Sequence, residues 1–209
     1  MGTITRIIAI ANQKGGVAKT TTAVNLSAWI SMMGKKVLLV DIDPQGNATT
    51  GVGVDKEQVI NCIYDAIING ITLRKIITST ALAGLNLVPA TIELAGAEVE
   101  LVGVEGRERV LKQALDEVKM KYDFVFVDCP PSLGLLTINA LVAADALIIP
   151  IQCEYYALEG LGQLMNTFKM VQQRLNPDLV LEGVLLTMFD GRTNLAIQVV
   201  DEVKKYFKE

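Results

Sequence analysis

The sequence predicts an α/β fold in which a doubly wound, mostly parallel sheet carries helices on both faces. Segments expected to be strands are apolar throughout, which is the pattern of strands buried on both sides. They alternate along the chain with segments of helical period, as in consecutive β-α-β units. With 209 residues, 51% hydrophobic and 20% charged, the chain is long and apolar enough for the core of one such domain.

The first β-α-β unit opens the chain. The apolar run 6–11 is expected to be a buried strand, because it stops at a glycine-containing loop. A helix over 20–33 follows, and Gly34 stands where a glycine just past a helix end would stop it. Residues 37–40 form the second buried strand, which the polar segment 41–47 ends.

The remaining elements follow from the same two periods. We expect strands over 85–88, 123–127, 146–149 and 180–186, and helices over 59–68, 92–102, 107–121, 161–175 and 195–207. The strand 146–149 lies before Pro150, and the helix 161–175 stops before Pro177. Ligands of doubly wound folds bind beyond the carboxyl ends of the strands, where the polar loops of this chain fall.

Composition excludes several classes of function. A net charge of −4 means that no global basic field draws the chain to DNA or anionic membrane, so such contacts must be local. No apolar run reaches the about 20 residues of a membrane span, and we expect a cytoplasmic protein. The absence of histidine excludes Ser-His triads and His-based metal sites. Cys62, Cys129 and Cys153 form no CxxC pair and are expected to be core thiols.

The segment 13–21, QKGGVAKTT, lies between a predicted strand and a predicted helix start. There, backbone N–H groups and the positive helix end are expected to surround a phosphate. Lys19 would neutralise phosphate oxygens, and the Thr20 hydroxyl would ligate Mg²⁺. The standard spelling GxxxxGK[ST] fails, because Gln13 and Ala18 occupy its glycine positions. If Ala18 takes a positive φ, the cost is about 1–2 kcal/mol, so Ala18→Gly is expected to tighten ATP binding. A glycine loop that merely turns the chain is the alternative.

The extra lysine makes KGGVAKTT resemble the deviant P-loop of the ParA/MinD family of partitioning and positioning ATPases, usually spelled KGGVGKTT. The segments VDIDPQGN (40–47), QCEYYALEGLGQL (152–164) and LLTMFDGRTNLAIQVVDEVKKYF (185–207) resemble its chromosomal ParA, or Soj, branch. Together they extend the resemblance over essentially the whole chain. The resemblance implies a P-loop NTPase fold, the cofactors ATP and Mg²⁺, and ATP hydrolysis in chromosome or plasmid partitioning.

The resemblance also implies roles for single residues. Lys14 would cross a nucleotide-sandwich dimer to the partner's phosphates, with a solvated loop lysine as the alternative. Asp43 would position or activate the hydrolytic water, with Asp41 in its supporting polar shell; without the resemblance, carboxylates that cap a strand end are an equal interpretation. Asp128 ends the strand before PPSLG (130–134), which looks like switch II, and would hold Mg²⁺ through water. The implied catalytic residues are Lys14, Lys19 and Asp43.

Nucleotide contacts are expected from the phosphate loop and from one residue after a later strand. The expected ATP-binding residues are Lys14, Gly15, Gly16, Val17, Ala18, Lys19, Thr20, Thr21 and Met188, and the metal ligands are Thr20 and, through water, Asp128. Met188 could lie near the adenine, although packing in the core or at its rim is equally open. Arg192, near Lys204, Lys205 and Lys208, is a possible DNA contact, with a solvated basic helix end as the alternative.

The resemblance further implies an ATP-dependent homodimer, nonspecific DNA as a ligand, a ParB-type DNA-binding protein as the stimulating partner, and a nucleoid-associated location. A nucleotide-dependent binding switch with negligible turnover stays open, as does a MinD-like positioning ATPase. Membrane attachment of MinD depends on a C-terminal amphipathic helix, and this sequence shows no such segment, so no membrane contact is expected. An iron–sulfur reductase is disfavoured because Cys129 and Cys153 show no cluster-ligand pattern.

One P-loop ATPase domain is expected to span 1–209. The family continues beyond its last helix here into another strand, a proline-containing loop that borders the adenine, and closing helices, whereas this sequence stops at Glu209. We therefore expect slow turnover from this short form.

Overall fold

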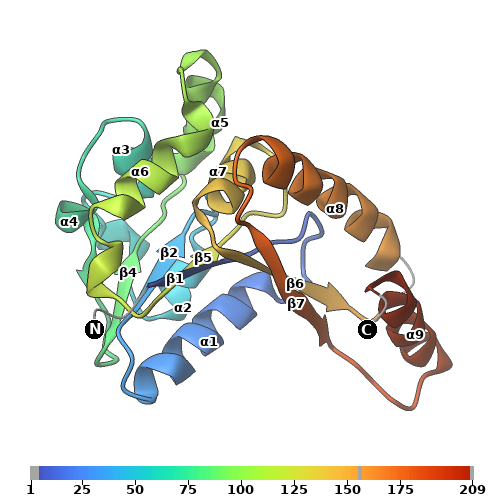
Figure 1. Ribbon diagram of the computed structural model, residues 1–209. Helices are drawn as coiled ribbons and strands as arrows, with labels where there is room; N and C mark the ends of the chain where they lie inside the picture. The colour runs from blue at the N-terminus through green and yellow to red at the C-terminus, as the bar shows by residue number, and fades with distance from the viewer. Residues whose placement is uncertain (1–4, 155–156, 208–209) are drawn as a thin grey trace.

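A computed structural model describes residues 5–154 and 157–207 (Figure 1). Within these residues one sheet has seven strands in the order β3-β4-β2-β5-β1-β6-β7. Their bounds are β1 Arg6–Ile10, β2 Val37–Asp41, β3 Thr78–Ser79, β4 Leu85–Val88, β5 Phe124–Asp128, β6 Ala146–Gln152 and β7 Val180–Thr187. All neighbours pair in parallel except the short edge strand β3, which is antiparallel to β4. The predicted doubly wound, mostly parallel sheet is confirmed.

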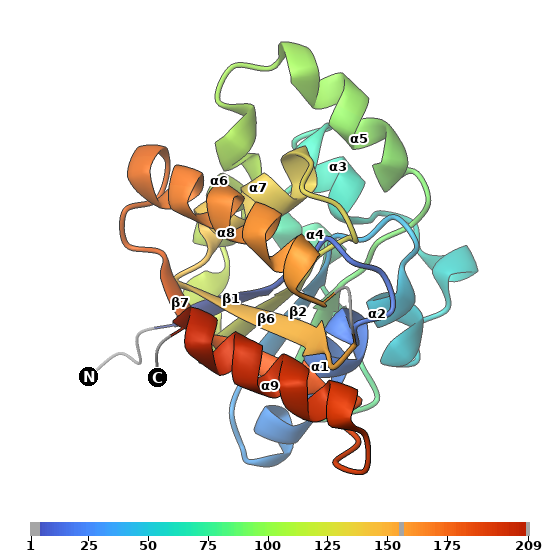
Figure 2. The same cartoon turned by 90° about the vertical axis from the view of Figure 1, so that its right-hand side faces the viewer.

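Helices cover both faces of this sheet. Their bounds are α1 Lys19–Met32, α2 Asn47–Gly51, α3 Ile63–Ile67, α4 Leu73–Ile76, α5 Leu94–Glu100, α6 Val110–Asp116, α7 Leu135–Ala143, α8 Ala157–Arg174 and α9 Asn194–Phe207. Figure 1 shows α1 below the sheet and α6, α7 and α8 above it, and Figure 2 shows α9 in front of β6 and β7. Within the described part of the chain, no helix combines the length and apolar character that a membrane crossing requires.

Strand β1 shows how the buried apolar runs serve two cores. Ile8 and Ile10 pack in a cluster with Ala23 of α1, whereas Ile7 and Ala9 pack in the cluster that contains residues of α6, α7 and α8. Successive strand residues point to opposite faces, so a strand between two helix layers must be apolar at every position. The three cysteines are buried and unbridged, as expected of core thiols.

Strand β6 runs past its predicted end, through Pro150 to Gln152. Proline lacks a backbone N–H and cannot donate a hydrogen bond to a neighbouring strand. A strand therefore tolerates proline where the adjacent strand has no carbonyl waiting for that bond. β1 ends at Ile10 and pairs with β6 only as far as Ile148. Beyond that point the Asn12 side chain donates to the Pro150 carbonyl at 2.7 Å. The expectation that the strand ends before this proline is wrong because β1 has already ended on that side.

Three predicted helices are shorter than expected. In 92–102 the α-helix α5 covers only Leu94–Glu100, and a 3₁₀ turn follows it. In 59–68 the helix α3 begins only at Ile63, because Ile60 is 92% exposed and Cys62 has extended backbone. In 107–121 the helix α6 lies between two 3₁₀ turns, of which the second is Lys119–Lys121. The Thr5 hydroxyl is 2.8 Å from the carbonyl oxygens of Lys119 and Tyr122, a distant contact that a periodic pattern does not reveal.

Four elements were not predicted: α2, α4, α7 and β3. The largest, α7, is buried at nearly every position from Leu136 to Ala143. A helix buried all round has no polar face, so its sequence lacks the amphipathic period used for the other helices. The others have five residues or fewer, too short for any period to be read. By contrast, Gly34 follows α1 with a φ of 83°, as a glycine past a helix end should.

Candidate active site

The carboxyl ends of three central strands bring the predicted motifs together. β5 lies between β1 and β2, and Asp128 at its end is in register with Ile10 on one side and Asp41 on the other. The loops that leave these strands therefore start side by side at one edge of the sheet. This edge is where a doubly wound fold binds its ligands.

A cavity of about 450 Å³ opens between these loops. Its lining residues are Gly15, Gly16, Ala18, Lys19, Thr20, Thr21, Asp43, Gln45, Asn47, Pro131 and Met188. They include seven of the nine expected ATP contacts and bring Met188, from the loop after β7, to the phosphate loop. Lys14 and Val17 are not on this wall. Val17 is buried, and its carbonyl accepts a hydrogen bond from the Thr187 hydroxyl at 3.2 Å.

The phosphate loop places Lys19 over its own backbone. Lys19 is the first residue of α1 and is 6% exposed, and its Nζ donates to the Lys14 carbonyl at 2.9 Å. Burial lowers the pKa of Lys19, while the nearby Asp128 acts in the opposite direction. A partly desolvated ammonium at a helix N-terminus suits an anionic phosphate group.

Among the residues of the site, Asp128 has the surroundings that best suit a bound cation. The side chain is fully buried, and neither carboxyl oxygen has a hydrogen-bond partner within the described residues. Burial, followed by repulsion from Asp41, raises the pKa of Asp128 to about 8, although the nearby Thr20 hydroxyl and Lys19 act in the opposite direction. An unpaired buried carboxylate is costly, and carboxylate and hydroxyl oxygens are preferred ligands of Mg²⁺. The donor set of Asp128 and Thr20 therefore fits Mg²⁺.

The other two aspartates have different surroundings. Asp43 lines the cavity, and its Oδ1 accepts a hydrogen bond from Gln45 N at 2.9 Å. Asp41 is not on the cavity wall and is fully buried. Burial raises the pKa of Asp41 to about 6, although hydrogen bonds from Thr49 act in the opposite direction. Asp43 thus reaches the place where a ligand would sit, and Asp41 lies behind it.

Lys14 lies on a different surface from the other phosphate-loop residues. Its side chain forms an ion pair with Glu154, which follows β6. It lines a separate cavity of about 450 Å³ whose wall includes Ser132 and Leu133 of the loop after β5. The backbone N–H of Lys14 donates to the Asn12 side chain at 3.0 Å. Within one chain, the ammonium group of Lys14 is therefore not directed at the phosphate cavity.

Arg192 is not brought to the cavity. Its guanidinium is held in two places by Asp190, with Nε 2.9 Å from Oδ1 and an Nη atom 2.6 Å from Oδ2. This bond raises the pKa of Arg192 and lowers the pKa of Asp190. Lys204 and Lys205 lie in the last turn of α9, at the opposite end of the helix from Arg192, and Lys205 pairs with Glu202 at 2.6 Å. The expectation that Arg192 lies near Lys204 and Lys205 is therefore wrong, because a helix of 14 residues separates them; Lys208 lies outside the described residues.

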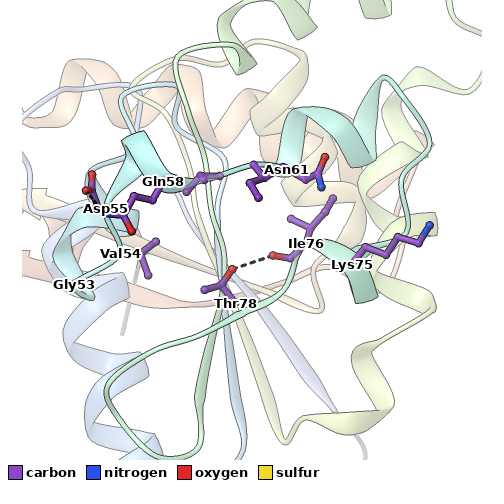
Figure 3. Close-up of a pocket in the computed structure, with 10 residues that line it drawn as sticks. Gly53, Val54, Asp55, Gln58, Asn61, Lys75, Ile76 and Thr78 are labelled. Atoms are coloured by element: carbon purple, nitrogen blue, oxygen red, sulfur yellow. Dashed lines mark hydrogen bonds between the residues drawn. The ribbon is translucent and has the colours of Figure 1, made fainter.

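A larger cavity, of about 650 Å³, lies away from all predicted site residues (Figure 3). It is bordered by the loop after α2 and by residues around Lys75. Its polar groups bond to one another: Gln58 donates to Asp55 at 3.0 Å, and the Thr78 hydroxyl donates to the Ile76 carbonyl at 3.2 Å. It contains no counterpart of the phosphate loop, so its size alone does not mark it as the active site.

Sequence reasoning did not single out three of the residues that line the cavity around the phosphate loop. Gln45 and Asn47 belong to VDIDPQGN, and Pro131 belongs to PPSLG, so all three lie inside motifs that were already identified. Their position in those motifs was the available signal. Thr49, which contacts Asp41, follows its motif by two residues and had no such signal.

Comparisons with known proteins identify relatives of this chain. Residues 5–181 match a family model described as an AAA domain. The chain is 61% identical over 204 residues to the sporulation initiation inhibitor protein Soj of Bacillus subtilis, over 98% of this chain and 81% of that protein. This chain belongs to the ParA/Soj family of P-loop ATPases. It is also 55% identical to the chromosome partitioning protein ParA of Myxococcus xanthus, over 99% of this chain and 73% of that protein.

Solved structures agree with this membership. A structure named cobyrinic acid a,c-diamide synthase from Mycobacterium smegmatis, with bound ADP and magnesium, has a TM-score of 0.92 and 44% identity, over 97% of this chain and 82% of that chain. The septum site-determining protein MinD of Pyrococcus horikoshii, complexed with Mg-ADP, has a TM-score of 0.75 and 28% identity. The match covers 94% of this chain and 77% of that chain. The resemblance seen in the motifs and the predicted P-loop fold are both confirmed.

The backbone conformation of Ala18, which the sequence left open, is left-handed in the structure, with a φ of 69°. Because the strain belongs to the folded backbone, relieving it should stabilise the fold. Ala18→Gly is expected to raise the free energy of unfolding by about 1 kcal/mol, the strain relieved less the added chain entropy of glycine. Urea denaturation measures this change.

Ala28→Gly is the matched control, because Ala28 lies inside α1. It should lose about 1 kcal/mol of stability through the low helix propensity of glycine. Equal destabilisation by both substitutions would show that Ala18 is not strained.

Proposed function

We propose that this ParA/Soj-family ATPase binds Mg·ATP in the cavity around Lys19, forms an ATP-dependent homodimer, and associates with nonspecific DNA. Stimulation by a ParB-type DNA-binding protein then triggers hydrolysis, so that cycling on the nucleoid supports partitioning. The buried carboxylate of Asp128 beside the phosphate loop, which has no hydrogen-bond partner in the part of the chain that the structure describes, carries the proposal. Residues 1–209 act in it as one ATPase domain.

Each cavity residue has a chemical task in this proposal. Lys19 and the loop N–H groups neutralise charge that develops on phosphate oxygens, which is the main form of catalysis in phosphoryl transfer. Thr20 and Asp128 hold Mg²⁺, which when bound neutralises phosphate charge and balances the buried carboxylate. Asp43 accepts a hydrogen bond from the attacking water and orients it. Met188 borders the adenine end of the cavity.

The dimer gives Lys14 its task. Its side chain lines a surface beside the loop after β5 rather than its own phosphate cavity, which supports a role toward the phosphates of a second copy. To take that role, Lys14 must leave its ion pair with Glu154. The two side chains are about one-third exposed, and solvent screening keeps the contribution of such a pair to about 1 kcal/mol, so a phosphate group readily replaces the carboxylate.

Lys14→Ala is expected to bind Mg·ATP within about threefold of the wild type, because Lys14 does not line the cavity. It should form no ATP-dependent dimer, and its turnover should fall by at least about 100-fold, as for a missing arginine finger. Calorimetry measures the ATP affinity, light scattering with ATP measures dimerisation, and phosphate release measures turnover.

Lys112→Ala, on the exposed side of α6, is the control for removing a surface lysine. Dimerisation of Lys14→Ala at the wild-type ATP concentration would refute the role in trans.

DNA association is tested separately from the nucleotide site. Co-sedimentation with a random-sequence duplex should require Mg·ATP, because the proposed binding form is the dimer. Arg192→Ala should weaken it, whereas turnover without DNA stays unchanged because Arg192 is absent from the cavity. Binding that is independent of ATP would contradict the proposed cycle.

A wild-type chain that binds ATP and DNA but releases no phosphate, even with a ParB-type protein, would favour the binding switch.

A further inference from the structure

We propose that Thr49 is a positioning residue for ATP hydrolysis, because it holds Asp41 and, through it, the turn that carries Asp43. The inference rests on the proposed role of Asp43. Thr49 lies in α2, is fully buried, and is absent from the wall of the nucleotide cavity. Its effect on the reaction must therefore pass through its neighbours.

The first part of the connection is a double hydrogen bond to one oxygen of Asp41. Both the backbone N–H and the hydroxyl of Thr49 donate to Asp41 Oδ2, at 2.8 Å and 2.7 Å. The other oxygen, Oδ1, accepts a hydrogen bond from the backbone N–H of Asp43 at 3.1 Å. The Asp41 carboxylate thus joins α2 to the residue that faces the ligand cavity. Thr49 fixes the orientation of this carboxylate.

The second part ties the same hydroxyl to the loop after β4. Thr49 Oγ1 accepts a hydrogen bond from Ala90 N at 3.0 Å while it donates to Asp41. One buried side chain therefore uses its donor and an acceptor site at once. Removing the hydroxyl would leave a buried N–H without its partner and Asp41 with one bond fewer, each a costly change in a dry interior.

The turn itself is held against the same loop. A side chain on Gly46 would come within 2.7 Å of the Ala90 carbonyl oxygen, so the two backbones are in close contact. Lys56 Nζ donates to the Gln45 carbonyl at 2.6 Å, and the Lys56 side chain also packs against Gly46. With its flanks packed in this way, the turn takes its position from outside the cavity. Such support fixes a reacting group before the ligand arrives.

A purely structural role for Thr49 makes a different prediction from a positioning role. If Thr49 only stabilised the fold, turnover per folded molecule would stay constant when its hydroxyl is removed. If it positions Asp43, kcat falls while KM for ATP changes little, because phosphate contacts come from the loop after β1. A displacement of about 1 Å can cost 100-fold in rate, so we expect a 10- to 100-fold fall in kcat.

The test compares kcat and KM for ATP among variants that separate hydroxyl from volume. Thr49→Val keeps the shape and loses the hydroxyl, whereas Thr49→Ser keeps the hydroxyl. We expect Thr49→Val to lose 10- to 100-fold in kcat with KM within about threefold, and Thr49→Ser to recover most of kcat. Thr50→Val is the matched control, because Thr50 lies on the exposed side of the same helix. Circular dichroism establishes the temperature at which all variants are folded.

Two outcomes would overturn the inference: a kcat of Thr49→Val within twofold of the wild type, or an equal loss in Thr49→Ser. Thr49→Ala, which also lacks the hydroxyl, replaces the valine variant if that one does not fold. Asp43→Asn is measured in the same series. If it turns over ATP like the wild type, the proposed role of Asp43 has failed; if it is inactive while Thr49→Val is normal, the present inference alone has failed.

Discussion

Replacing Lys19 with alanine is expected to abolish saturable Mg·ATP binding in a calorimetric titration. Lys19 is the buried cation of the cavity, and its Nζ bonds to the Lys14 carbonyl. Hydrogen bonds between a charged donor and an anionic acceptor contribute about 1.5–3 kcal/mol each, so losing them weakens binding by about 100-fold. The remaining affinity would lie outside the range of the titration that saturates the wild type.

The loss should not result from unfolding. Burial lowers the pKa of Lys19, which means that its charge is disfavoured in the absence of a ligand. Removing it should therefore leave the thermal midpoint unchanged or slightly higher. Lys112→Ala, which removes an exposed lysine outside the cavity, again shows the effect of losing one positive charge alone. ATP affinity of Lys19→Ala within threefold of the wild type would mean that the phosphates bind elsewhere.

Asp43→Asn should abolish hydrolysis and leave ATP binding intact. The amide keeps the shape of the side chain, and its oxygen still accepts from Gln45 N, which Asp43 Oδ1 contacts at 2.9 Å. It lacks the negative charge needed to orient and activate water. General-base catalysis contributes about 100- to 10,000-fold, so phosphate release should fall to the background of the assay.

Calorimetry on the same sample should show a dissociation constant for Mg·ATP within about threefold of the wild type. Asp178→Asn is the matched control, because Asp178 is an exposed carboxylate far along the chain. Full turnover by Asp43→Asn would exclude this residue from water activation. Loss of binding together with turnover would assign Asp43 to the ligand rather than to the water.

Much of the site could be predicted because each motif is a short, contiguous segment. The strand, loop and helix start around Lys19 follow one another directly, so their local structure depends on neighbours in sequence. The glycine of the P-loop pattern at position 18 raised the question of a left-handed Ala18, and the structure answered it with a φ of 69°. Asp41 and Asp128 were located because apolar runs end at them.

Other features depend on contacts between distant segments. Strand β6 continues through Pro150 because β1 ends beside it, and α7 escaped prediction because it is buried all round. The pair between Lys14 and Glu154 joins loops after two different strands. Thr49 reaches Ala90 across 41 positions of the chain. No periodic pattern encodes such pairs, because they arise from strand order and packing.

The sequence by itself determined the α/β class, the family resemblance and the candidate residues for phosphate chemistry, since these depend on local composition and contiguous motifs. Only the tertiary structure decided which of those residues share a cavity. It brought Met188 to the phosphate loop, placed Asp41 behind Asp43, and kept Lys14 outside. The physical reason is register: parallel strands that are far apart in sequence end at one edge, and the order β2-β5-β1-β6 fixes which loops meet there.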